Sequence, residues 1–191
     1  MIMQTNANQK EKQSKYSLTL FIFIGLVVIG IIVLMGVWMR NSKVERFGIG
    51  NQIPEITMTS FQGESYSLSQ MRGKIIVINF WASWCTTCDA ESYMLQEVWE
   101  EMEPNNDIQF LGVDYVDTEI PALEFINDHG LTYPNCPDLG SKISELFGIS
   151  GVPETFLIDQ DGVLKAIQIG PFDSAYDLRS FIEQAVNQEE E

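Results

Sequence analysis

Hydrophobic and polar positions divide the chain into an apolar N-terminal segment and a patterned region that follows it. Residues 18–39 are almost wholly apolar and carry no charge. As a helix rising 1.5 Å per residue, this segment reaches about 33 Å, enough to cross a bilayer core of roughly 30 Å. The run is long for a cleaved secretory signal, and it ends in a poor cleavage site. We therefore predict an uncleaved transmembrane signal anchor over 18–39.

After the anchor, short apolar runs alternate with segments of helical period. Buried or paired strands are predicted over 75–81 and 108–114, and hairpins over 55–59 with 64–68 and 155–159 with 163–169. Helices are predicted over 85–102, 121–129 and 142–147, and from 173 or 174 to about 187. This order predicts an α/β fold in which a central mixed β-sheet is flanked by helices on both faces.

The pattern also predicts how the chain is organised. We expect a cytoplasmic tail over 1–17, the anchor over 18–39, a linker over 40–52, the folded domain over 53–187 and an acidic tail over 188–191. Positive charges flank the anchor almost equally on its two sides, so the positive-inside rule does not decide its orientation. The chain also carries a Cys-x-x-Cys thiol pair at Cys85 and Cys88. Such a pair is most useful on the oxidising side of a membrane, which predicts a single-pass membrane protein with an extracytoplasmic domain.

Charge excludes one class of partner. The chain has a formal net charge of −16, and from Phe47 onward 25 Asp and Glu residues face only 5 Lys and Arg residues. Such a surface repels phosphate backbones, so nucleic-acid binding is not expected. The same charge also keeps the domain soluble.

The stretch Trp84-Cys85-Thr86-Thr87-Cys88 carries the chemistry. A thiol at the start of a helix is stabilised as thiolate by unpaired backbone N–H groups and by the helix dipole. Cys85 is therefore the predicted nucleophile, and Cys88 is predicted to resolve the mixed disulfide. A zinc site would need about four ligands, and only Cys136 and His129 remain to supply them. No cofactor is expected.

Three further motifs give the sequence a family resemblance. Residues 80–88 resemble the active-site segment of thioredoxin-like proteins. Residues 67–74 and 151–159 restrict the resemblance to one group of these proteins. Together they look like the TlpA/ResA/CcmG (DsbE) group of membrane-anchored thiol-disulfide oxidoreductases. The resemblance implies a thioredoxin fold and reduction of protein disulfides, including those of apocytochrome c. It also implies re-reduction by a membrane electron donor of the CcdA/DsbD type.

The resemblance assigns roles to residues around the thiols. It implies a cis peptide bond before Pro153, with Val152, Pro153 and Glu154 forming a platform for substrate. Glu91 matches an acidic position of the group, one helical turn after Cys88. Either glutamate is a candidate to raise the thiol pKa or to relay a proton, and the alternative for each is a solvated surface carboxylate.

Asn79 stands where thioredoxins place a buried acid, so a proton relay must come from another residue, such as Glu91. Negative charge near the thiols disfavours thiolate and therefore the reduced form, which predicts a reductant rather than an oxidant. Thr87 departs from the proline that the group often has before the second cysteine, and this leaves the potential open.

Other residues and functions complete the sequence predictions. Trp84 is expected to be an exposed substrate contact, Trp81 a core residue, Cys136 a buried structural thiol and His129 a helix-end residue. A peroxiredoxin-like peroxidase is the first alternative, but Ile78 and Ala82 stand where it would need Pro and Thr or Ser. A non-enzymatic metal-binding module and an inactive scaffold are the others.

Overall fold

The computed structural model describes residues 24–35 and 47–186, and the chain divides into two compact units, Met1–Lys43 and Val44–Glu191. In the first unit, residues 24–35 form a helix whose large apolar side chains are exposed. Among the described residues, no helix is long and apolar enough to span a bilayer. The predicted anchor over 18–39 extends beyond both ends of 24–35. The predicted tails over 1–17 and 188–191, and residues 40–46 of the predicted linker, lie outside the described residues.

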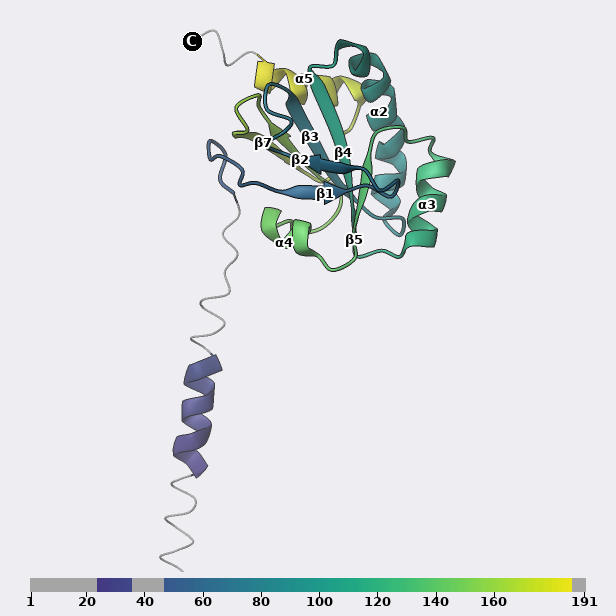
Figure 1. Ribbon diagram of the computed structural model, residues 1–191. Coiled ribbons are helices and arrows are strands. Elements are labelled where there is room, and N and C mark those ends of the chain that lie inside the picture. The colour runs from purple at the N-terminus through teal and green to yellow at the C-terminus, as the bar shows by residue number, and fades with distance from the viewer. Residues whose placement is uncertain (1–23, 36–46, 187–191) are drawn as a thin grey trace, which may run out of the picture. The chain divides into compact units, whose positions relative to one another are not determined.

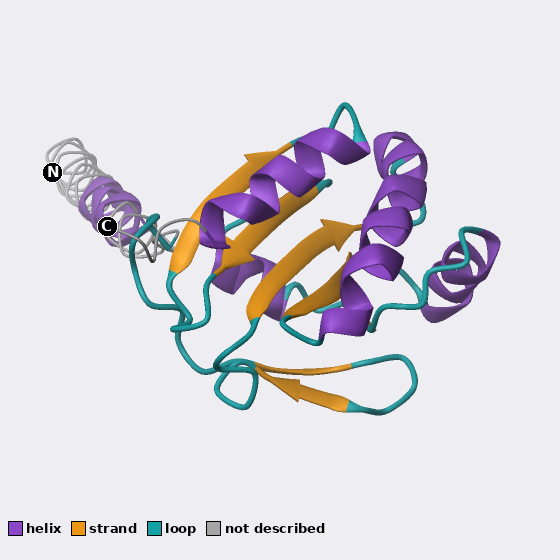
Figure 2. Cartoon of the chain, turned by 90° about the horizontal axis from the view of Figure 1, so that it is seen from above, coloured by secondary structure: helices purple, strands orange, loops and turns teal. Residues whose placement is uncertain are grey.

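A five-stranded mixed sheet forms the centre of the second unit, with strand order β5-β4-β3-β6-β7 (Figures 1 and 2). β3, β4 and β5 run parallel, β6 is antiparallel to β3, and β7 is antiparallel to β6. The strands are β3 (Ile75–Trp81), β4 (Ile108–Tyr115), β5 (Asn135–Asp138), β6 (Glu154–Ile158) and β7 (Leu164–Ile169). A separate two-stranded hairpin consists of β1 (Thr57–Thr59) and β2 (Ser65–Ser67).

Helices cover both faces of this sheet (Figure 2). They are α2 (Thr86–Met102), η1 (Glu103–Asn105), α3 (Glu119–Asp128), α4 (Lys142–Phe147) and α5 (Ala175–Val186). Apolar side chains of α2, α3 and α5 share one buried cluster with Val77 and Phe110 of the sheet. Phe147 of α4 and the side chains of the β1–β2 hairpin share a second cluster with Ile78 and Phe80. We name these the α2 face and the α4 face.

The two faces follow from the period of two along β3. Every residue of β3 is buried, as expected for a central strand covered on both sides. Successive side chains point to opposite faces, so Trp81 joins the cluster of the α2 face and Phe80 that of the α4 face. Asn79 therefore points to the α2 face, where it donates to Glu91 of α2 and Thr155 of β6.

Most predicted elements are confirmed within a few residues, and the helix over 142–147 is confirmed at both ends. The prediction missed β5. This strand has four residues and contains Pro137, a residue that cannot donate a hydrogen bond to a neighbouring strand. Pro137 is tolerated because β5 lies at the edge of the sheet, paired only with β4. A parallel edge strand this short leaves no alternating pattern in the sequence.

Candidate active site

Cys85 lies where the central strand passes into the first turn of α2. β3 ends at Trp81, and Cys85 is the N-cap residue of α2 with extended backbone angles, φ −92° and ψ 106°. The Cys88 backbone N–H donates to Cys85 Sγ over 3.1 Å, so the sulfur takes the place of a capping oxygen. Cys85 and Cys88 form a disulfide, and both residues are buried, at 6% and 2% exposure. The pair predicted from the sequence is therefore close enough to cycle between dithiol and disulfide.

Two further groups contact Cys85 Sγ. The Thr87 hydroxyl lies 3.4 Å away, and the sulfur of a disulfide accepts hydrogen bonds but cannot donate them, so the hydroxyl is the donor. The Val152 carbonyl oxygen lies 3.7 Å away, at the peptide bond to Pro153, which is cis as the resemblance implies. The structure thus brings the Val152–Pro153 turn next to the cysteine pair, although the two are far apart in the sequence.

Glu91 is buried on the α2 face rather than solvated, with 1% of its surface exposed. Its Oε1 accepts from the Phe172 backbone N–H (3.1 Å) and its Oε2 from Asn79 Nδ2 (3.3 Å). Asn79 Nδ2 also donates to Thr155 Oγ1 over 2.9 Å. Burial raises the pKa of Glu91 to about 7, and the two hydrogen bonds oppose this rise. Glu91 can therefore hold or release a proton near neutral pH, one helical turn after Cys88.

Glu154 is also buried, but on the other side of the sheet. Its Cα is paired in register with that of Phe80, and directly opposite residues of a sheet share a face. The Glu154 side chain therefore points to the α4 face, where Oε1 accepts from the Ser150 backbone N–H over 2.6 Å. The alternative of a solvated carboxylate is wrong for this residue, which is 1% exposed. Its predicted part in substrate binding stays a prediction.

The two tryptophans next to the cysteines differ in environment as predicted. Trp81 is 2% exposed, stacks on Phe125 at a ring distance of 4.6 Å and donates from Nε1 to Asn135 Oδ1. Trp84 is 59% exposed, and its ring centroid lies 6.5 Å from that of Tyr115 at the end of β4. Trp84 is thus a large, exposed aromatic side chain next to Cys85 in the sequence, and its role as a substrate contact stays a prediction.

Sequence reasoning missed Asp114, which lies opposite Trp81 in the register of β3 and β4. The side chain is 1% exposed, and no hydrogen bond to its Oδ1 forms among the described residues. Burial raises its pKa to about 7, and the carboxylates of Asp117 and Asp138 add to the rise. Its position in the sequence could have identified it. An acidic residue at the carboxyl end of the strand next to β3 lies at the same edge of the sheet as the cysteines.

Cys136 and His129, the other two residues considered as metal ligands, are held by the fold. Cys136 is fully buried in β5, and burial raises the pKa of its thiol to about 12, so it stays protonated at neutral pH. His129 caps the end of α3, with Nδ1 2.8 Å from the Phe125 carbonyl oxygen and Nε2 2.8 Å from Asp89 Oδ1. Within 24–35 and 47–186, no group of three or more His, Cys, Asp or Glu side chains is arranged to hold a metal ion.

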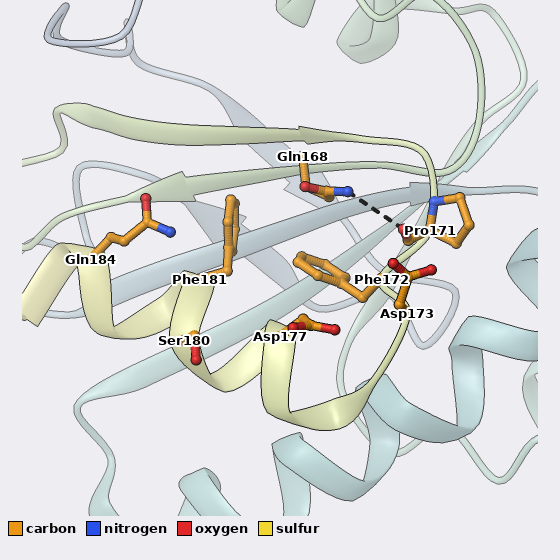
Figure 3. Close-up of a pocket in the computed structure, with 8 residues that line it drawn as sticks. All are labelled: Gln168, Pro171, Phe172, Asp173, Asp177, Ser180, Phe181 and Gln184. Carbon is orange, nitrogen blue, oxygen red and sulfur yellow. Dashed lines mark hydrogen bonds between the residues drawn. The ribbon is translucent and has the colours of Figure 1, made fainter.

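A pocket of about 270 Å³ opens between the end of β7 and α5 (Figure 3). Its lining includes Phe172 and Phe181, whose rings meet edge to face at 5.2 Å, and the carboxylates of Asp173 and Asp177. The cysteines do not line it. Its connection to the site is through Phe172, whose backbone N–H holds Glu91.

Comparison with known proteins agrees with this geometry. The profile of the AhpC/TSA family matches residues 49–167. Thiol-disulfide oxidoreductase ResA of Bacillus cereus is 31% identical over 127 residues, which cover 66% of this chain and 72% of the relative. StoA of Bacillus subtilis is 25% identical with a TM-score of 0.59, over 68% of this chain and 96% of that structure.

A more distant structure supports the fold alone. A thiol:disulfide interchange protein of the thioredoxin family from Chlorobium tepidum is 22% identical with a TM-score of 0.65, and the match covers 73% of this chain and 99% of that one. The thioredoxin-like fold predicted from the sequence is therefore confirmed for the domain. With its redox-active cysteine pair in that fold and its likeness to ResA, the chain belongs to the AhpC/TSA family and, within it, to the TlpA/ResA/CcmG-like thiol-disulfide oxidoreductases.

Proposed function

We propose that this oxidoreductase works as a reductant of protein disulfides outside the cytoplasm, through the Cys85–Cys88 dithiol. The observation that carries the proposal is the buried Glu91, which lies one turn beyond Cys88 and has a pKa of about 7. When it is ionised, its negative charge disfavours a thiolate nearby. A reduced form that is destabilised in this way gives up its electrons readily, as a reductant requires.

The reaction is an exchange of one disulfide for another. The Cys85 thiolate attacks one sulfur of the substrate disulfide, that S–S bond breaks, and the substrate's other sulfur leaves as a thiolate that takes a proton. Cys88 then loses its proton and attacks Cys85 Sγ, which breaks the mixed disulfide and releases the second substrate thiol. The protein ends with the Cys85–Cys88 disulfide, and the substrate ends with two thiols. Glu91 can accept the Cys88 proton and pass it on.

Several groups prepare Cys85 for this attack. The Cys88 N–H and the Thr87 hydroxyl contact its sulfur, and both are donors that stabilise a thiolate. The Val152 carbonyl oxygen lies 3.7 Å from the same sulfur, next to the cis bond. A substrate strand that pairs with this stretch of backbone would present its disulfide to Cys85, which supports the predicted roles of Val152 and Pro153.

We place the enzyme on the outer side of the bacterial cell membrane, anchored by residues 18–39. The length and the lack of charge of that segment support an anchor. Treatment of intact cells with a protease tests this. The anchored domain should be digested, while a cytoplasmic marker protein survives. Digestion of the domain only after cell lysis would contradict it.

For the physiological substrate we propose the disulfides of apocytochrome c, and for the electron source a membrane thiol donor of the CcdA/DsbD type. Both follow from the resemblance to the TlpA/ResA/CcmG group. A Cys88→Ala variant leaves the mixed disulfide on Cys85 unresolved and should trap the substrate covalently. Recovery of apocytochrome c from this variant, but not from a Cys85→Ser/Cys88→Ala control, supports the proposal. Recovery of other proteins alone would contradict the cytochrome assignment.

A peroxidase function is the alternative closest to the family profile. Peroxide reduction needs an activating Pro and Thr or Ser before the reactive cysteine, and this chain has Ile78 and Ala82 there. We therefore expect reduction of a disulfide substrate such as insulin without peroxide turnover at catalytic enzyme concentration. Rapid consumption of hydrogen peroxide by the reduced chain would favour the peroxidase instead.

A further inference from the structure

The loop after β4 forms a second wall beside the disulfide. Because β3 and β4 are parallel and paired up to Trp81 and Asp114, the residues that follow each strand emerge at the same edge of the sheet. Asp117 Oδ2 accepts from the Ser83 backbone N–H over 2.9 Å, which ties this loop to the segment between β3 and α2 that leads to Cys85. We name residues 115–120 together with Trp84 the second wall, because the Val152–Pro153 turn already forms the first.

The second wall exposes apolar side chains. Trp84 is 59% exposed, Val116 42% and Ile120 72%. Val116 also has a φ of +49°, in the left-handed region that a β-branched residue rarely adopts. Backbone in such a conformation is held by its surroundings and tends to occur at binding sites. Exposed apolar side chains beside a redox disulfide fit an apolar side chain of an incoming polypeptide.

Charge is distributed unevenly between the two ends of the sheet. Arg72 and Lys74 directly precede β3, so they lie at the end opposite the disulfide. Lys165 is near the start of β7, which is also at that opposite end, and its Nζ lies 3.7 Å from Asp159 Oδ2. Arg179 pairs with Glu97 and Glu101 in the second half of α2, away from the cysteines.

The end that carries the disulfide is acidic by contrast. Among the Lys and Arg residues of 47–186, only Lys142 lies near this end, at the start of α4. Asp117 and Glu119 belong to the second wall, and the Asp89 side chain next to Cys88 is 62% exposed. An approaching chain therefore meets negative charge around the disulfide with little positive charge to offset it.

We propose that the second wall is a docking surface for a cationic segment of the substrate protein, in which an apolar residue and Lys or Arg residues flank the disulfide. The proposal rests on the proposed function and adds the substrate class to it. The apolar residue packs against Trp84 and Val116, while the cations face Asp117 and Glu119. Electrostatic attraction of this kind acts mainly on the rate of encounter and weakens as salt is added.

The test uses the full-length protein, reduced beforehand and kept in detergent, with two short disulfide peptides that differ only in flanking Lys or Glu residues. Single-turnover rates are measured by acid quench at low and high ionic strength. At low ionic strength the Lys peptide should react at least about tenfold faster than the Glu peptide, and the ratio should approach one at high ionic strength. Equal rates for the two peptides at low ionic strength would overturn the proposal.

Variants locate the effect on the surface. Glu119→Lys should lower the Lys-to-Glu rate ratio several-fold, whereas Glu103→Lys, an equal change in net charge on η1 at the opposite end, should leave it nearly unchanged. Val116→Ser with Ile120→Ser should slow both peptides by about fivefold, because the apolar contact is shared. Equal effects of Glu119→Lys and Glu103→Lys would show that only net charge acts, and would overturn the docking surface. Failure to reduce either peptide would instead contradict the proposed function.

Discussion

The two faces of the sheet bury polar groups for different purposes. On the α4 face, Asp138 accepts hydrogen bonds from the backbone N–H groups of Ile143 and Ser144 and from the Ser144 hydroxyl, and so fixes the start of α4. On the α2 face, Glu91 has fewer donors, and burial raises its pKa to about 7. A buried carboxylate that is fully satisfied is structural, whereas one that is only partly satisfied keeps a proton within reach of chemistry.

The side chains buried at the middle of the sheet also differ between the two faces. Phe80, Phe147 and Phe156 pack against one another on the α4 face, with ring distances of 5.0 to 5.5 Å. On the α2 face, the neighbouring strand residues Asn79 and Thr155 form a hydrogen-bonded group with Glu91 instead. Both faces pack aromatic rings, but the α2 face also buries a titratable carboxyl group, Glu91, one helical turn after Cys88.

The largest contrast is expected between cysteines on the two faces. Cys85→Ser removes the nucleophile and should lower insulin-disulfide reduction by more than about a thousandfold. Cys136→Ala, which changes a thiol buried on the α4 face, should leave the rate per folded molecule unchanged. Turnover assays on both variants check this. Activity that survives in Cys85→Ser and disappears in Cys136→Ala would reverse the assignment of the redox site.

An aromatic residue of the α4 face should affect stability without affecting redox chemistry. Phe156→Ala leaves a cavity in the ring cluster and should lower the free energy of unfolding by about 3 to 5 kcal/mol. Urea denaturation of the oxidised protein measures this loss, with Phe156→Leu as a milder control. The midpoint potential of the folded fraction should stay at the wild-type value, and a large shift in potential would show that the two faces are not independent.

Glu91→Gln should change how stability depends on pH. The folded protein holds a proton on Glu91 up to about pH 7, whereas the unfolded chain releases it near its ordinary pKa of 4.5. The wild type therefore loses stability as the pH rises through this window, by up to about 3 kcal/mol above pH 7 and by nothing below the lower value. In Glu91→Gln this loss is absent, so urea denaturation at pH 5 and pH 8 should differ less than in the wild type. An unchanged difference would show that Glu91 does not titrate in the folded protein.

The smallest effect is expected at Thr87. Thr87→Val removes the hydroxyl that contacts Cys85 Sγ, so the thiolate fraction of Cys85 at neutral pH should fall about threefold to tenfold. The pH dependence of alkylation by iodoacetamide measures that fraction. Thr87→Ser should keep the wild-type profile, and Thr86→Val is the matched control on the neighbouring exposed threonine. Identical profiles for Thr87→Val and Thr86→Val would show that the Thr87 hydroxyl does not stabilise the Cys85 thiolate.

The sequence predicted the site where chemistry depends on local spacing. Cys85, Cys88 and Glu91 lie within two helical turns, so their spacing already places them together. Glu154 could not be placed in this way, because its face depends on the strand register that pairs it with Phe80. Asp114 is missed for a related reason, since its place opposite Trp81 depends on the pairing of β3 with β4. β5 is too short, and too disrupted by Pro137, for its pattern to be visible before β4 is in place.

The midpoint potential of the Cys85–Cys88 couple tests the central claim most directly. The full-length protein is equilibrated with defined thiol-disulfide buffers at pH 7, and the fraction oxidised is measured after acid quench. If the protein is a reductant, its midpoint potential should lie in the range of thioredoxin, about −270 mV, or lower. A potential near that of the strong oxidant DsbA, about −120 mV, would contradict the assignment of this site as a reductase.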